Sequence, residues 1–345
     1  MSENKNLQTK LDKQKNNNLK IRTLSAMIML CFLAVYLLLV VFSTEAQRQG
    51  WKIDPRITSY VFYGCTMVLL VISIHELANS LGYKKIWMQI LIVILPLAIF
   101  YFPFFKANNL SIIDVDAQIH LWFDWWFTLI MVSCYFLLLL ALSFASKEEH
   151  AKRKMIVLFA YSLIIIIGFK GLSEIALTMN TIGNHLDHNP KYGFMTIIWV
   201  WGTVILTDTF AYLGGTKFGK TPLAPTISPK KSCEGALIGT VGATLIGALV
   251  ANLSFYLVPN FGPLSWNLGT VQATMPKVIP GLLLTLLTLL ISILGQLGDL
   301  LFSGLKRMVG IKDFANCFPG HGGVLDRFDS LIFVTFFLFI IIQII

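Results

Sequence analysis

Charged residues gather in one short stretch of an otherwise apolar chain, from residue 303 to residue 329. This stretch reads SGLKRMVGIKDFANCFPGHGGVLDRFD and sets aspartates, lysines and arginines beside the glycine-rich run 319–323. Carboxylates bind divalent cations, basic side chains bind phosphate oxygens, and glycine leaves the backbone accessible. The combination suits a polyphosphate bound together with a metal ion, and the alternative is a solvated charged loop.

A stripe of polar residues leads into this stretch. Its members are spaced by four, three, four and three positions: Ser292, Gln296, Asp299, Ser303 and Lys306. This spacing places them on one face of a helix. Because apolar residues cover the other faces, the carboxylate of Asp299 must be protonated, paired or bound to a metal ion.

A second carboxylate, that of Asp326, lies beyond the glycine-rich run and could fold back toward Asp299. Two carboxylates from separate elements form a platform for Mg²⁺ in phosphoryl or nucleotidyl transfer. Asp299 and Asp326 are therefore candidate metal ligands. The alternative without a metal is an ion pair of Asp299 with Lys306, or of Asp326 with Arg327.

A second polar segment extends from Asp208 to Gly235 and reads DTFAYLGGTKFGKTPLAPTISPKKSCEG. Asp208 and Tyr212 are one helical turn apart and face the same way. Ser232 could cap a helix whose first amides favour phosphate. The P-loop pattern GxxxxGK[ST] does not occur, and a lysine patch for anionic lipid headgroups is the alternative interpretation.

The composition predicts the setting of these segments. Of the 345 residues 56% are hydrophobic and 13% are charged, with a mean hydropathy of +0.72. A soluble domain carries about 25% charged residues, so we expect an all-α polytopic membrane protein. Nine apolar segments are candidate spans: 24–43, 57–81, 86–105, 125–145, 155–175, 193–213, 234–258, 277–302 and 329–345.

Basic residues predict the orientation of these spans. Most of the 27 lysines and arginines fall in alternate loops, together with the polar tail 1–22. By the positive-inside rule the N-terminus and both charged segments are cytoplasmic. This distribution accounts for the net charge of +9 without any nucleic acid partner. We expect one membrane domain: a basic tail (1–22), N-terminal helices (23–200) and a catalytic region (201–345).

Outside the catalytic region few residues could do chemistry. The five cysteines have no CxxC spacing and are expected to be free thiols. His75 and Glu76 stand out because ionisable groups in a span are costly and are functional candidates by default. Their place near the cytoplasmic end of a span means that they could instead meet water.

The chain resembles the phosphatidate cytidylyltransferases, the CDP-diacylglycerol synthases, in its last third. The resemblance lies in Ser303-x-Leu305-Lys306-Arg307-x4-Lys312-Asp313 and continues through Pro319-Gly320-His321-Gly322-Gly323-Val324-Leu325-Asp326-Arg327-Phe328-Asp329. The segment Asp208 to Gly235 and Gly298-Asp299-Leu300 are similar to that family as well. The similarity is convincing over residues 200–345 and weak before them.

The resemblance implies an activity and a set of partners. CTP and phosphatidic acid would give CDP-diacylglycerol and pyrophosphate for phospholipid synthesis, with Mg²⁺ required and a second, monovalent cation left open. The resemblance also implies a helical enzyme of the cell membrane with nine spans, acting on the cytoplasmic side and commonly dimeric. The homodimer and the bilayer are thus the expected partners.

The same resemblance assigns residues. Asp299 and Asp326 would hold the metal. Phosphate-binding and other catalytic positions would be Lys306, Arg307, Lys312, Asp313, His321, Arg327 and Asp329. Substrate-binding candidates are Asp208, Tyr212, Lys230, Lys231, Glu234 and Ser303. Two other functions stay open, a CTP-dependent lipid kinase and an ion-coupled transporter; a transporter would predict matching broken helices in two halves.

Overall fold

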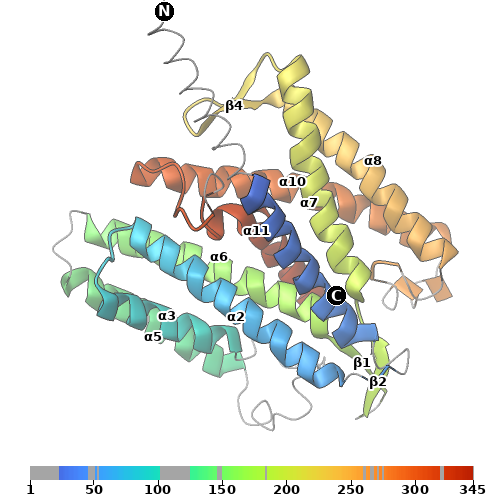
Figure 1. Cartoon of the computed structure of the whole chain (residues 1–345), viewed down its shortest axis with the longest axis horizontal. Helices are drawn as coiled ribbons and strands as arrows, with labels where there is room; N and C mark the ends of the chain where they lie inside the picture. The colour runs from blue at the N-terminus through green and yellow to red at the C-terminus, as the bar shows by residue number, and fades with distance from the viewer. Residues whose placement is uncertain are drawn as a thin grey trace, which may run out of the picture.

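The computed structural model describes residues 23–45, 51–52, 54–101, 125–145, 150–182, 185–258, 262–264, 268–269, 272–273, 276–318 and 322–344. Long helices make up most of this part of the chain (Figure 1). They are Thr23–Glu45, α2 (Pro55–Ser80), α3 (Ile86–Tyr101), α5 (Trp125–Ala145), α6 (Ala151–Leu177), α7 (Phe194–Phe218), α8 (Cys233–Leu257), α10 (Val278–Val309) and α11 (Leu325–Ile344).

Seven of the helices in the described part are long and apolar enough to cross a membrane. Of the other two, α3 has only 16 residues, and α11 carries Asp326, Arg327 and Asp329 at its start. The protein is therefore an all-α, multi-pass membrane protein, as its composition predicts. The tail 1–22 lies outside the described residues.

The helix bounds refine the predicted segments where the chemistry lies. Helix α10 continues to Val309, seven residues beyond the predicted end, so Ser303 and Lys306 stay on the helix that carries Asp299. Helix α11 begins at Leu325, four residues before the predicted start, and brings Asp326 into its first turn. The predicted polar stripe is thus a continuous helix face, and its last members reach the charged loop.

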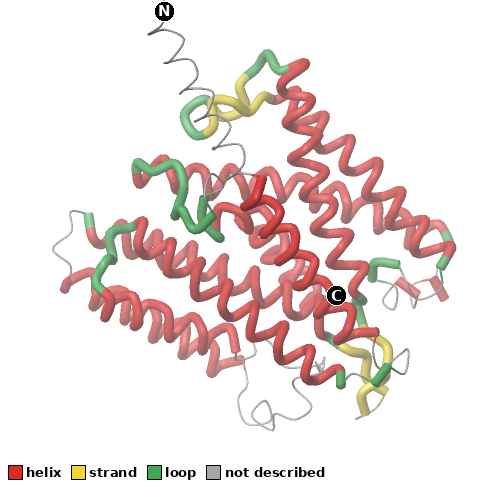
Figure 2. The backbone as a smooth tube through the Cα atoms, viewed as in Figure 1, coloured by secondary structure: helices red, strands yellow, loops and turns green. Residues whose placement is uncertain are grey.

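Strands occur only as two short hairpins among the described residues. Strands β1 (Met179–Ile182) and β2 (His185–Pro190) pair antiparallel, as do β3 (Pro222–Ala224) and β4 (Ser228–Ser232). The two hairpins lie at opposite ends of the molecule (Figure 2). The β3–β4 hairpin connects α7 to α8 and carries the paired lysines of the second polar segment.

Glycine allows α7 and α8 to approach each other closely. A Cβ atom added to Gly235 would lie 2.7 Å from the carbonyl oxygen of Ala211, and one added to Gly239 would lie 2.8 Å from that of Thr207. Small residues at this four-residue spacing let helix backbones meet in a membrane. The contact fixes the base of the β3–β4 hairpin against the end of α7.

Polar side chains join α10 to the same pair of helices. Ser292 Oγ lies 2.8 Å from Thr207 Oγ1 on α7, and Gln296 Nε2 donates to Thr240 Oγ1 on α8 over 2.8 Å. The first half of the polar stripe therefore holds helices together. This leaves Asp299, Ser303 and Lys306, further along the stripe, to face the charged loop.

Candidate active site

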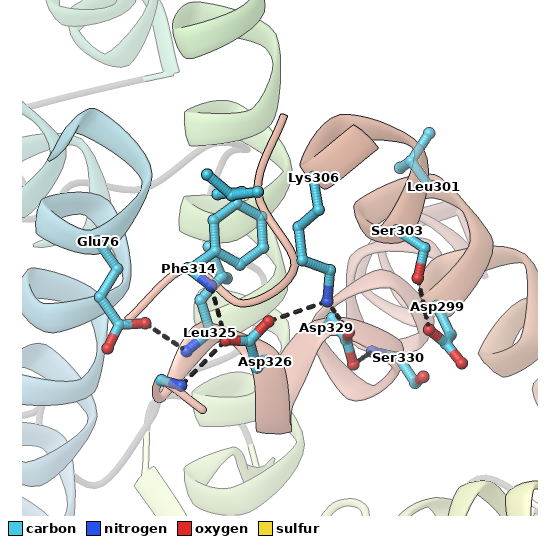
Figure 3. Close-up of polar contacts among 12 residues, drawn as sticks. Glu76, Asp299, Leu301, Ser303, Lys306, Phe314, Leu325, Asp326, Asp329 and Ser330 are labelled. Carbon is cyan, nitrogen blue, oxygen red and sulfur yellow. Dashed lines mark hydrogen bonds and ion pairs between the residues drawn. The ribbon is translucent and has the colours of Figure 1, made fainter. Parts of the chain in front are cut away.

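Asp299 lies where α10 passes the β3–β4 hairpin. Its Oδ2 atom forms an ion pair with Lys231 Nζ from β4, and its Oδ1 atom accepts a hydrogen bond from Ser303 Oγ over 3.1 Å. Ser303 is one turn further along α10, as the spacing predicted (Figure 3). Both Asp299 and Lys231 are about a quarter to a third exposed, with side-chain accessibilities of 26% and 31%. The pair is therefore within reach of a ligand.

A buried cluster of charge lies next to this pair (Figure 3). Lys306 Nζ is 2.9 Å from Asp326 Oδ1 and 3.8 Å from Asp329 Oδ2, and each of the three residues is 8% exposed. One ammonium group thus faces two carboxylates from the first turns of α11. The ion pairs named as the alternative to a metal were Asp299 with Lys306 and Asp326 with Arg327. In the structure, Lys306 forms an ion pair with Asp326, and Lys231 forms one with Asp299.

Asp326 also orders the loop that precedes it. Its Oδ2 atom accepts hydrogen bonds from the backbone amides of Phe314 at 2.8 Å and Gly323 at 2.9 Å. Gly322 has a φ of 87°, and a Cβ atom there would lie 2.9 Å from Asp326 Oδ2. A glycine is needed at this position because it allows the left-handed backbone and leaves room for the carboxylate.

These side chains face a common polar cavity of about 300 Å³. Five aspartates, one lysine and one arginine line it: Asp208, Asp299, Asp313, Asp326, Asp329, Lys306 and Arg327. They come from α7, α10, α11 and the loop after α10. The structure therefore brings seven of the predicted site residues around one space, with Lys231 and Ser303 bonded to Asp299 at its edge.

The remaining predicted residues of the hairpin segment have different positions. Glu234 accepts hydrogen bonds from the amides of Lys220 and Thr221, at 3.0 Å and 3.1 Å, and so holds the loop after α7. Ser232 caps α8 by accepting from the amide of Gly235 over 3.1 Å, as predicted. Lys230 is exposed, and Tyr212 is 71% exposed.

Two predicted residues of this region, Arg307 and Lys312, do not line the described cavity. Arg307 donates to the carbonyl oxygens of Ile227 at 3.1 Å and Ile311 at 2.9 Å, which ties the hairpin to the end of α10. Lys312 is exposed beside Asp313. His321 lies outside the described residues.

A second, apolar cavity of about 830 Å³ adjoins the polar one. The helix Thr23–Glu45 and α2 supply most of its walls, with Phe318, Val324 and Phe328 from the signature region. Trp201, Ile205 and Arg327 line both cavities. A polar space and an apolar space therefore meet at one tryptophan, one isoleucine and one arginine.

Sequence reasoning missed the part played by Glu76. This side chain is 2% exposed and accepts hydrogen bonds from the amides of Val324 and Leu325, at 3.0 Å and 2.8 Å. The signal was an ionisable residue inside a predicted span, which also fitted a group that meets water. The structure excludes that second interpretation for Glu76, whereas the neighbouring His75 is exposed.

The donor set of the polar cavity fits Mg²⁺ bound together with a ligand. Carboxylates outnumber basic side chains around the cavity, so a phosphate group would be repelled unless a cation accompanied it. No group of three His, Cys, Asp or Glu side chains in the described residues could hold a metal ion by itself. Mg²⁺ is usually held by one or two carboxylates, water and substrate phosphates, which agrees with this arrangement.

Comparisons with known proteins agree with the family resemblance found in the sequence. The profile of the cytidylyltransferase family matches residues 20–345. A phosphatidate cytidylyltransferase of Bacillus subtilis is 32% identical over 253 residues, which cover 70% of this chain and 83% of that protein. Phosphatidate cytidylyltransferases of Helicobacter pylori and Staphylococcus saprophyticus are 41% and 39% identical over 41% and 44% of this chain. These two matches span 45% and 50% of the relatives' own lengths.

Proposed function

The chain belongs to the cytidylyltransferase family, and from this premise we propose that it transfers the cytidylyl group of CTP to phosphatidic acid. The products are CDP-diacylglycerol and pyrophosphate, so the reaction serves phospholipid synthesis. One observation of the structure carries the proposal. The polar cavity with its carboxylates and basic groups opens beside an apolar cavity, and Arg327 lines both.

This junction suits one soluble and one lipid substrate. A nucleoside triphosphate needs charged and polar walls, whereas acyl chains need an apolar groove that excludes water. Arg327 is placed to bind the phosphate of a lipid whose chains lie against α2 and the helix Thr23–Glu45. The volume of the apolar cavity, about 830 Å³, is large enough to hold a substantial part of an acyl chain.

The reaction is a direct displacement at the α-phosphorus of CTP. A phosphate oxygen of phosphatidic acid forms the new P–O bond, and the bond to the bridging oxygen between the α- and β-phosphates breaks. Pyrophosphate leaves with the electron pair of that bond. Since the attacking phosphate is already anionic, no strong base is required, and the protein acts by positioning and charge.

The basic residues around the cavity supply the positive charge. Lys306 lies between Asp326 and Asp329, so its ammonium group is fixed in place and can stabilise negative charge that grows on the leaving pyrophosphate. Lys231 forms an ion pair with Asp299 and is the basic group of the hairpin that we expect to bind the triphosphate. Asp208 and Asp313 complete the polar wall.

Asp299 and Asp326 are the proposed ligands of Mg²⁺, which supplies charge neutralisation at the α- and β-phosphates when bound. Asp326 accepts three hydrogen bonds within the protein, two on Oδ2 from backbone amides and one on Oδ1 from Lys306, so Oδ1 is the less occupied oxygen. A carboxylate has about four acceptor directions, which leaves one for a further ligand. A monovalent cation is a second candidate for the same carboxylate-rich wall.

The topology and the assembly belong to the same proposal. Nine spans would include α3 and α11 besides the seven apolar helices, with a cytoplasmic N-terminus. The polar cavity would then face the cytoplasm, where CTP is available, in the cell membrane. A homodimer is the proposed assembly.

A transfer assay tests the activity. Purified protein in detergent receives CTP labelled at the α-phosphate, phosphatidic acid and Mg²⁺, and a parallel sample receives diacylglycerol. We expect label in chloroform-soluble lipid with phosphatidic acid alone, and EDTA should abolish it. Labelled CDP formed with diacylglycerol would instead identify a lipid kinase. If neither labelled lipid nor labelled CDP forms, the proposal of an enzyme loses its support.

A further inference from the structure

A carboxylate from the N-terminal half of the chain holds the loop of the C-terminal site. Glu76 lies on α2, and both of its oxygen atoms accept hydrogen bonds from backbone amides at the start of α11. Figure 3 shows the bond to Leu325. Oε1 accepts from the amide of Val324 at 3.0 Å, and Oε2 accepts from the amide of Leu325 at 2.8 Å. Oε1 also accepts from Cys317 Sγ over 3.3 Å.

The start of α11 needs such a partner. The first amides of a helix have no acceptor within the helix, and the helix dipole makes this end positive. At the start of α11, Glu76 accepts from the amide of Leu325, the first residue of the helix, and from that of Val324 just before it, while Asp326 accepts from the amide of Gly323. Glu76 is the one that comes from another helix, so it fixes the start of α11 relative to α2.

Close packing leaves little freedom in this contact. A Cβ atom added to Gly323 would lie 2.5 Å from Glu76 Oε2, so the second glycine of the GG pair makes room for this carboxylate. Glu76 is 2% exposed, which places the carboxylate out of water and makes its hydrogen bonds obligatory. Within the glycine-rich run that the sequence suggested for phosphate, Gly322 and Gly323 therefore face the carboxylates of Asp326 and Glu76.

Val324 and Leu325 directly precede Asp326 and Arg327, which line the polar cavity. A shift of these two amides would move both side chains. In catalysis by positioning, a displacement of about 1 Å can reduce the rate about 100-fold. The contact from α2 is thus in a position to control the alignment of the site without reaching the substrates.

We propose that Glu76 is a positioning residue for the transfer reaction, which holds the start of α11 so that Asp326 and Arg327 face the substrates. The inference rests on the proposed function. It gives the N-terminal helices a part in the chemistry, although the charged signature lies wholly in the C-terminal third.

The substitution Glu76→Gln tests the inference at constant side-chain size. The amide keeps one acceptor oxygen but turns an NH₂ group toward a backbone N–H, so one of the two helix contacts is lost. We expect kcat per folded protein to fall about tenfold or more, and the KM for CTP to change less than about threefold. Folded protein is measured by size-exclusion chromatography and by the thermal unfolding temperature.

A matched control lies one turn earlier on α2. Ser73 is buried, and its hydroxyl has no hydrogen-bond partner in the described structure, so Ser73→Ala removes a buried polar atom without touching the loop. We expect its kcat to equal that of the wild type. A similar loss in both variants would show a general effect of changing α2 and would overturn the inference.

The reactivity of Cys317 reports the contact independently of activity. Burial, the hydrogen bond to Glu76 and the charge of Glu76 all raise the pKa of the Cys317 thiol. A raised pKa lowers the thiolate fraction at a given pH, so Glu76→Gln should speed modification of Cys317 by N-ethylmaleimide at pH 8. Mass spectrometry of the Cys317 peptide measures this rate in wild type, Glu76→Gln and Ser73→Ala.

The outcomes separate the two proposals. A wild type without transfer activity would reject the proposed function, whereas an active wild type with an equally active Glu76→Gln would reject only the role of Glu76. If Glu76→Gln does not fold, Glu76→Asp takes its place, since it keeps the charge but is too short to reach both amides. Failure of both variants to fold would make Glu76 a structural residue and overturn the inference.

Discussion

The N-terminal and C-terminal halves of the molecule bury charge in different ways. In the N-terminal half, Lys170 donates to the carbonyl oxygen of Phe100 over 2.9 Å, and Glu76 accepts from backbone amides. In the C-terminal half, Lys306 faces the side chains of Asp326 and Asp329 at the wall of a cavity. Lys306, Asp326 and Asp329 can share their charge with a ligand because they line the polar cavity, whereas Lys170 and Glu76 line neither the polar nor the apolar cavity.

The N-terminal half contributes to the site by positioning the helix that carries part of its charge. The helices α7, α10 and α11 and the loop after α10 supply the charged groups, and α11 packs against α6 and α2 of the N-terminal half. Gly168 and Gly171 on α6 leave no room for a side chain against the carbonyl oxygens of Ile332 and Thr335 on α11. The N-terminal half thus determines where α11 lies, and α11 carries two of the buried carboxylates.

The largest effect on activity is expected at Asp299, which tests most directly whether the charges of the C-terminal half serve the chemistry. The substitution Asp299→Asn removes the negative charge that pairs with Lys231 and that we propose as a ligand of Mg²⁺. The size of the side chain stays the same. We expect turnover to fall about a thousandfold or more, the upper range for loss of one preorganised charge, with the protein still folded. Incorporation of label from CTP into lipid measures the rate. Near-normal activity would refute the assignment of Asp299 to the chemistry.

A second test compares two buried lysines, one from each half. Lys306 is 8% exposed and lies 5.3 Å from the ring centre of Phe314; Lys170 is 7% exposed and lies 6.0 Å from that of Phe100. Breaking a buried ion pair costs about 3–5 kcal/mol, so Lys306→Met should lower the unfolding temperature. We also expect its kcat per folded protein to fall about 100-fold.

Lys170→Met is the control for that test. It should lower the unfolding temperature as well, because the carbonyl oxygen of Phe100 loses a donor. Its kcat per folded protein should stay within about twofold of the wild type, since surface and core changes away from a site act on stability. Equal losses of kcat in the two variants would mean that the halves do not differ in the way their buried charges are used.

The sequence could predict the helices and the polar stripe but not the pairing of the charges. Helical spacing put Asp299, Ser303 and Lys306 on one face, and α10 shows them there. Which lysine meets which carboxylate depends on where the β3–β4 hairpin and α11 lie in space. Spacing within one helix favoured Lys306 for Asp299, and the partner is Lys231, 68 residues away in sequence.

Glu76 and the glycine pair show the same limit. An ionisable residue in a span marks a candidate, but its partners, the amides of Val324 and Leu325, are 248 and 249 residues away. Glycines in a charged loop suggested open backbone for phosphate, whereas Gly322 and Gly323 make room for protein carboxylates. Contacts between elements far apart in the chain determine the partners of Glu76 and the role of the two glycines. A local sequence pattern cannot predict such contacts.

A smaller effect is expected from the neighbouring lysines of the hairpin. Lys231 forms the ion pair with Asp299, whereas Lys230 is exposed. We expect Lys231→Ala to lower kcat/KM for CTP about 10- to 100-fold and Lys230→Ala to lower it less than about fivefold, because an exposed charge is screened by salt. The ratio between the two variants is the readout. A ratio near one would mean that the hairpin acts as a lysine patch for anionic lipid and not as part of the site.

The smallest effect is expected one turn before Asp299 on the same stripe. Gln296 donates to Thr240 Oγ1 and to the carbonyl oxygen of Ala236, so it joins α10 to α8 and does not line the polar cavity. A side-chain hydrogen bond between helices in a membrane contributes about 0.6 kcal/mol on average. We therefore expect Gln296→Leu to keep kcat within about threefold, with a small decrease in the unfolding temperature. A large loss of kcat at normal stability would show that Gln296 takes part in the chemistry. The part of the polar stripe that serves the reaction would then begin before Asp299.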